Sequence, residues 1–123
     1  MSEKLKIVDA HHHLWDLGAN YYPWLHEEPN AGFFLGDYEA LKRDYLPPDY
    51  RSDADGLEVV KTVHCEAEWD RNNQVGETHW LTEVAARYGM PNAVVAHAWF
   101  HTENSYAALE AQSQFSMVCG IRS

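Results

Sequence analysis

Short apolar runs rich in β-branched residues recur along the chain, separated by segments in which apolar positions have helical spacing. The runs predict strands at residues 6–11, 58–65, 93–99 and 117–121. The helical spacing predicts helices at residues 37–46, 76–88 and 105–114. Several of the runs are apolar on both faces, as in a parallel sheet that helices cover. The chain is therefore predicted to be an α/β protein in which parallel strands alternate with helices.

Individual residues predict where the helices begin and end. Gly89 is expected to end the second helix, because glycine accepts the left-handed conformation that often follows a helix. Ser105 is a plausible N-cap of the third. Pro47 and Pro48 are expected to terminate the first, since proline cannot continue a helix.

The connection at residues 14–56 interrupts the regular alternation. It is far longer than the 2–6 residues usual between a strand and a helix. It is also rich in aromatic side chains, which allows two interpretations. The aromatic residues form a satellite core of a packed excursion, or the segment is a lid over the end of the first strand and a few of them wall a pocket.

Composition and charge narrow the possible functions. The chain has 123 residues, of which 46% are hydrophobic, and a formal charge of −10. It has no cluster of Lys and Arg for nucleic acid and no apolar run long enough for a membrane helix. Asp9 comes too early for a secretory signal, so we expect a cytoplasmic protein. Cys65 and Cys119 lack CxxC spacing, and both are expected to be reduced and buried.

Three consecutive histidines end the first predicted strand. Because side chains alternate between the faces of a strand, His11 and His13 are expected to project together and His12 to the other face. Two neutral imidazoles that project together can bind one divalent cation. The alternative is that this end of the strand is only a polar cap.

Ordered segments of the chain carry a resemblance to a known family. They are residues 7–16 (IVDAHHHLWD), 63–69 (VHCEAEW), 80–81 with 87–89, 93–98 (AVVAHA) and 118–122 (VCGIR). In this order and spacing they resemble the amidohydrolase superfamily. The closest resemblance is to its branch of TIM-barrel hydrolases that includes L-fuconolactonase and L-rhamnonolactonase.

The resemblance implies a fold, a metal and a reaction. The chain would be a single domain, residues 1–123, that forms the N-terminal half of a (β/α)8 barrel. His11 and His13 match the metal ligands of the family's first strand, and the metal would be divalent, with zinc the first choice. The reaction would be hydrolysis of a lactone or other cyclic ester of a sugar acid. The catalytic residues stay unassigned, because the family's general-base Asp lies on a later strand beyond this chain.

Four further residues are candidates for substrate binding. Arg122 offers a guanidinium fork to a carboxylate or carbonyl, or it forms a structural ion pair at a strand end. Glu66 contacts substrate or orients a metal ligand, or is a solvated acid at a strand end. His97 faces the mouth of the barrel or is a core histidine, and Trp15 lines a pocket or packs in the core.

Three hypotheses about function remain open at this point. The first is a lactonase-like hydrolase whose substrate is a small carboxylate or lactone and whose catalysis requires a C-terminal half. The second is a decarboxylase of the same superfamily. The third is a truncated, non-catalytic half-barrel that associates with itself into a homo-oligomer, because an open parallel fragment exposes apolar surface.

Overall fold

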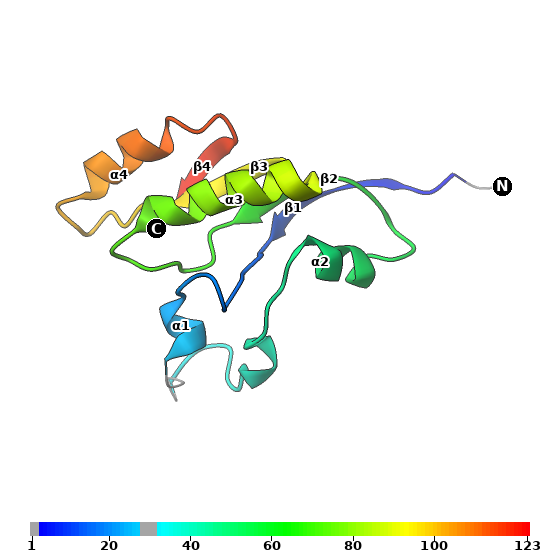
Figure 1. The fold of residues 1–123 in the computed structure, drawn as a ribbon, viewed down its shortest axis with the longest axis horizontal. Coiled ribbons are helices and arrows are strands. Elements are labelled where there is room, and N and C mark those ends of the chain that lie inside the picture. The colour runs from blue at the N-terminus through cyan, green and yellow to red at the C-terminus, as the bar shows by residue number, and fades with distance from the viewer. Residues whose placement is uncertain (1–2, 28–31) are drawn as a thin grey trace.

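The computed structural model describes residues 3–27 and 32–123 and contains a four-stranded parallel sheet (Figure 1). The strands are β1 (Lys6–His12), β2 (Glu58–Cys65), β3 (Ala93–His97) and β4 (Val118–Arg122). Their order in the sheet is β1-β2-β3-β4, so neighbours in the sequence are neighbours in space. This arrangement confirms the predicted α/β class and matches half of a TIM-barrel-like fold.

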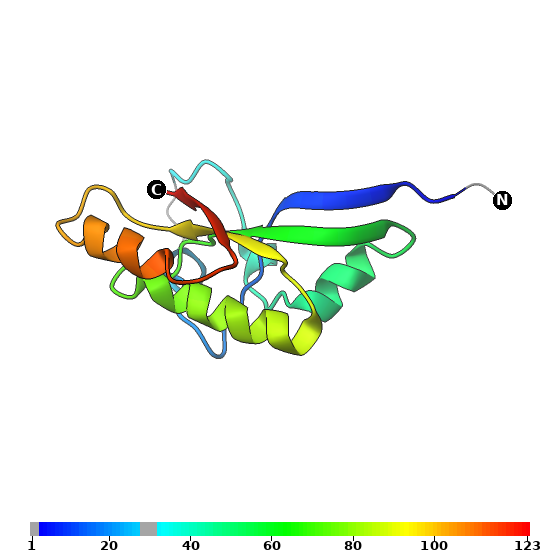
Figure 2. The ribbon, with the colours of Figure 1, turned by 90° about the horizontal axis from the view of Figure 1, so that it is seen from above.

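Helices connect the strands. They are α1 (Pro23–His26), the 3₁₀ helix η1 (Glu39–Leu41), α2 (Pro47–Asp53), α3 (Gln74–Tyr88) and α4 (Ser105–Gln112). Figure 2 shows α2, α3 and α4 on the same side of the sheet. Because all three strand pairs are parallel, the carboxyl ends of the four strands lie at the same edge of the sheet.

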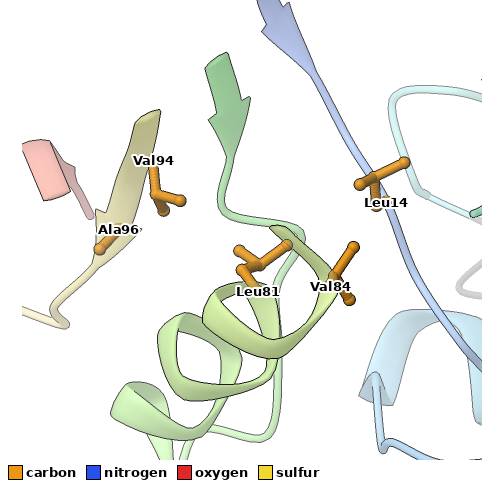
Figure 3. Packing of buried hydrophobic residues seen from close by; sticks show 5 residues of the cluster. All are labelled: Leu14, Leu81, Val84, Val94 and Ala96. Carbon is orange, nitrogen blue, oxygen red and sulfur yellow. The ribbon is translucent and has the colours of Figure 1, made fainter. Parts of the chain in front are cut away.

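The main core lies between α3 and the sheet. Leu81 and Val84 of α3 pack against Val94 and Ala96 of β3 and against Leu14 (Figure 3). All five side chains are buried. The helix thereby fixes the position of the chain just beyond the histidines of β1.

The α3 helix follows the sequence pattern closely. It begins at Gln74, two residues before the predicted start, and ends at Tyr88 as predicted. Gly89 adopts the left-handed conformation at φ 77°, and its N–H donates to the Ala85 carbonyl at 2.9 Å. The predicted role of Gly89 is confirmed.

The predicted helix at residues 37–46 is wrong. Only a single 3₁₀ turn forms there, and the α-helix comes afterwards, with Pro47 and Pro48 at its start rather than at its end. Proline is favoured at the first positions of a helix because the N–H that it lacks would have no intrahelical partner there. The Asp49 side chain accepts the Leu46 N–H at 3.0 Å, which satisfies one of the remaining donors.

The long connection folds back and packs. Trp15 and Tyr45 exchange two backbone hydrogen bonds, at 3.0 and 2.9 Å, and so close the segment between them. A second core cluster forms around its aromatic residues: Trp15, Tyr22, Leu25, Ala67 and Trp69. The satellite-core interpretation is correct for these side chains. The connection includes residues 28–31, which lie outside the described residues.

Two further expectations can be compared with the structure. Cys65 is buried as expected, but Cys119 is exposed, and both are free thiols. Among the described residues, none of the helices has the length and apolar character needed to cross a membrane.

Candidate functional site

The first part of the candidate site is the histidine run at the end of β1. His11 is exposed, His12 is buried and His13 is partly buried. The rings of His11 and His13 lie with their centroids 5.0 Å apart, edge to face. The ring of His12 packs against Tyr50 and His64 instead. The pairing of β1 with β2 is irregular between Asp9 and His12, so this stretch is not a plain extension of the strand.

His13 is held in one tautomer by the neighbouring strand. Its Nδ1 lies 2.8 Å from the carbonyl oxygen of Cys65, which can only accept, so Nδ1 carries the proton. Burial lowers the pKa of His13, which favours the neutral ring. In that state Nε2 keeps its lone pair and can coordinate a metal. A carbonyl that orients the ring in this way is typical of metal-binding histidines.

His12 does not share this arrangement. Both of its ring nitrogens are buried without a hydrogen-bond partner. Burial lowers its pKa to about 4, so it is a neutral ring in the interior. Of the three histidines, His11 and His13 therefore fit a divalent cation in donor type and proximity, and His12 belongs to the packing.

Glu66 and Arg122 form the second part of the site. The Glu66 side chain is 2% exposed, and Arg122 Nε donates to its Oε1 at 2.7 Å. A second nitrogen of the guanidinium, Nη2, donates to the Glu66 carbonyl at 2.8 Å. The structural ion pair that the sequence left open is therefore present. Arg122 is nevertheless 41% exposed, so it also faces the space above the strand ends.

His97 lies beside this ion pair at the end of β3. Its ring is 2% exposed, and Nδ1 lies 4.0 Å from Glu66 Oε2 without a hydrogen-bond partner. Glu68 follows Glu66 and donates its N–H to the same Oε2 at 2.8 Å. Its backbone is left-handed, with φ 54°, which is uncommon for a residue other than glycine.

A pocket of about 670 Å³ opens over the carboxyl ends of β1, β2 and β4. Four of the predicted residues line it: His13, Trp15, Glu66 and Arg122. Its wall is aromatic and apolar, and the residues concerned are Trp24, Phe33, Phe34, Leu35 and Leu41. The long connection therefore supplies a pocket wall as well as a satellite core. His11 and His97 are not among the lining residues.

A buried pair that the sequence patterns did not indicate consists of Glu77 and His64. Glu77 of α3 accepts the Ala67 N–H at 2.9 Å and lies 3.3 Å from Nε2 of His64. His64 Nδ1 accepts the Leu14 N–H at 3.1 Å, so its proton is on Nε2 and points to Glu77. Burial lowers the pKa of His64 and raises that of Glu77, so both groups tend to be neutral. The available signal was spacing, because Glu77 precedes Leu81 and Val84 by four and seven residues on the buried helix face.

The chain is similar to a curated protein of unknown function and to a solved amidohydrolase structure. No family model matches the chain. An uncharacterised protein, y4mH, from Sinorhizobium fredii is 40% identical over 118 residues, which are 96% of this chain and 39% of that protein. The crystal structure of an amidohydrolase from Burkholderia multivorans with bound zinc has a TM-score of 0.58 and 25% identity. That match covers 94% of this chain and 36% of the amidohydrolase.

Of these two likenesses, the one to the amidohydrolase structure supports the amidohydrolase superfamily suggested by the sequence. Both likenesses extend over nearly the whole of this chain. The chain, however, spans about two fifths of the length of each of these two proteins.

Proposed function

We propose that the chain is the N-terminal part of a metal-dependent hydrolase of the amidohydrolase type, which opens a lactone or other cyclic ester of a sugar acid. One observation carries the proposal: His13, held by Cys65 in the tautomer of a metal ligand, lines the same pocket as Arg122. The fold supports it, because α/β barrels place their sites at the carboxyl ends of the strands. The zinc bound to the similar amidohydrolase supports the choice of metal.

Four residues that line the pocket, and His11 beside His13, have parts in this proposal. His11 and His13 would hold the cation, which when bound polarises a carbonyl and lowers the pKa of water. Arg122, which lines the pocket, would bind a carboxylate or the lactone carbonyl through the guanidinium N–H groups that do not donate to Glu66. The buried Glu66 carboxylate holds the Arg122 side chain in place. Trp15 and the aromatic wall would exclude water from the bound substrate.

The decisive test is an assay on the protein encoded by the complete reading frame. A panel of sugar-acid lactones would be followed by proton release in a weakly buffered indicator solution. Ring opening is expected with zinc, and H13N should lower kcat/KM by about a hundred-fold or more, because it removes a metal ligand. H79N, on the exposed face of α3, is the matched control. Activity that H13N leaves unchanged would contradict the proposal.

Arg122 has its own kinetic test. R122M should raise KM or lower kcat/KM, because the guanidinium fork to the substrate is lost. R122K keeps the positive charge but not the guanidinium fork. Its kcat/KM should therefore lie between that of the parent protein and that of R122M. Kinetics unchanged in R122M would remove Arg122 from the substrate site.

The aromatic wall favours a second candidate, decarboxylation of an aromatic or unsaturated acid. Trp24 and Phe33 are stacked on each other, with ring centroids 6.1 Å apart, and both line the pocket, which suits a planar substrate. The same protein would be given aromatic acids, and carbon dioxide release would be measured. Carbon dioxide without lactone opening would favour the decarboxylase.

A homo-oligomer and a cytoplasmic location complete the proposal. Apolar side chains on or beside β1 and β2 are exposed: Leu5, Val8, Leu57 and Val60. A second copy that covered them would bury apolar surface, which favours association. Light scattering at micromolar concentration tests this, and a strictly monomeric chain would count against it.

A further inference from the structure

The ends of β2 and β3 bring together three side chains with metal-binding atoms. Glu66, Glu68 and His97 each offer one such atom, and the three atoms lie within 4.8 Å of one another. Within residues 3–27 and 32–123, this is the one group of three His, Cys, Asp or Glu side chains with that proximity. It involves neither His11 nor His13.

The buried nitrogen of His97 differs from those of His12, which also lack partners, because it faces the buried carboxylate of Glu66. Nδ1 is inaccessible to solvent and has no hydrogen-bond partner, although it lies 4.0 Å from a carboxylate oxygen of Glu66. A buried polar atom without a partner is costly, and an ion or water is the usual explanation for one in a native protein. A cation between Nδ1 and that oxygen would give Nδ1 the partner that it lacks.

Acceptor capacity on Glu66 and the exposure of Glu68 leave room for a cation. Arg122 occupies Oε1 of Glu66, whereas Oε2 accepts one N–H from Glu68 and retains acceptor capacity. Each carboxylate also faces a guanidinium group, Glu66 at 2.7 Å from Arg122 and Glu68 at 3.6 Å from Arg71. A dication would therefore compete with Arg71 for the exposed Glu68 carboxylate. Glu68 lines the pocket and its side chain is 47% exposed, so it gives an ion a path from solvent.

We propose that Glu66, Glu68 and His97 form a divalent cation site, with zinc as the preferred ion, separate from the His11 and His13 pair. Zinc bonds of about 2.0–2.2 Å place neighbouring ligand atoms roughly 3.3–3.6 Å apart. The 4.0 Å between His97 Nδ1 and Glu66 Oε2 would therefore shorten by about half an ångström. The widest separation in the group, at most 4.8 Å, would shorten by about 1.5 Å or less. One imidazole and two carboxylates suit zinc or manganese better than magnesium or calcium, which take oxygen ligands. This inference stands whether or not the proposed hydrolase activity is correct.

The test uses the 123-residue chain with the first histidine pair removed. The H11N/H13N double variant, stripped of metal with a chelator, would be titrated with Zn²⁺ by calorimetry and with Co²⁺ by visible absorption. We expect saturable binding of one Zn²⁺ per chain. Adding E68Q should weaken it about ten-fold or more, because even residues that only orient a metal ligand have effects of that size.

Two further variants make the test decisive. H97N should abolish binding, provided that circular dichroism shows a folded chain, and E68Q decides alone if it does not. H79N is the matched control, because His79 lies on the exposed face of α3, 3.8 Å from Glu83 in an ordinary surface pair. The proposal is overturned if the double variant binds no Zn²⁺ saturably, if E68Q leaves binding unchanged, or if H79N weakens it as much as E68Q.

Discussion

The end of β1 and the ends of β2 and β3 treat their polar side chains in opposite ways. At the end of β1, His11 is exposed and His13 keeps one ring nitrogen available. At the ends of β2 and β3, polar groups are buried and most are bound to one another, as in the contacts of Glu66 with Arg122 and of Glu77 with Ala67. At the end of β1, the free ring nitrogens can bind a ligand and contribute little to the stability of the fold. At the ends of β2 and β3, the polar atoms form contacts that stabilise the fold. Substitutions should separate the two.

The largest loss of stability is expected for E77A. It removes the acceptor of the Ala67 N–H and of His64 Nε2 from a fully buried position, and leaves a cavity as well. The free energy of unfolding should fall by about 3 kcal/mol, which urea denaturation measures. E77Q, which keeps an acceptor, should lose about 1 kcal/mol. A loss in E77A no greater than in E77Q would show that the hydrogen bonds of Glu77 do not matter.

Replacement of Arg122 should have the next largest effect. R122M leaves the buried Glu66 carboxylate without its cationic partner, and the free energy of unfolding should fall by about 2 kcal/mol. This is less than for a fully buried ion pair, because Arg122 is partly exposed. R122K should recover roughly half of that loss through its charge. Equal stability of R122M and the parent chain would mean that water can replace Arg122 as the partner of the Glu66 carboxylate.

The pH dependence of stability gives a third test of the buried region. Burial raises the pKa of Glu77 to about 8 from an ordinary value of 4.5, and Glu66 nearby adds to the shift. Between these values the folded chain binds a proton that the unfolded chain has lost, so stability is full below pH 4.5 and declines as pH rises through about 8. The contribution of Glu77 should decline most steeply, by about 1.4 kcal/mol per pH unit, near pH 6–7, midway between the two pKa values, and should level off above pH 8.

Urea denaturation of metal-free protein from pH 6 to 9 measures that decline. His64 faces Glu77 from β2, and His13 and His97 also act on its charge, but the lowered pKa of His64 changes stability only on the acid side, below about pH 6.5. E77Q should flatten the alkaline decline, since it does not titrate. An alkaline decline retained in E77Q would assign it to another group.

The smallest effect is expected at the end of β1. H11N changes an exposed ring, and the free energy of unfolding should move by less than about 0.5 kcal/mol in metal-free protein. Thermal or urea denaturation suffices to check it. A loss comparable to that of R122M would show that the histidine pair has a structural role and would end the contrast between the regions.

Local patterns in the sequence predicted the sheet and its main helix. The strands, α3 and the stop at Gly89 follow from apolar spacing and from the backbone freedom of glycine. Pro47 and Pro48 led to the wrong helix prediction, because proline is compatible with both the end and the beginning of a helix. Asp49, at the third helical position, was the signal for a beginning.

Local sequence patterns predicted only part of the candidate site. Arg122 and Glu66 were candidates separately, but their pairing spans 56 positions and depends on the sheet order. The partner of His64 on α3 likewise depends on how the helix packs. Spacing along one strand or helix can indicate which residues share a face, whereas contacts between elements require the tertiary arrangement.

The two hydrogen bonds between Trp15 and Tyr45 have a consequence for engineering and evolution. They clamp the segment that carries the pocket wall at its base, close to where it leaves the sheet. Lengthening a clamped loop is inexpensive, since doubling it costs only about 0.6 kcal/mol in closure entropy. Within this segment Tyr22 and Leu25 belong to the second core cluster, whereas Phe34, Leu35 and Leu41 line the pocket and are exposed. Substitutions at these three positions can therefore reshape the pocket wall while the cluster and the strands stay as they are.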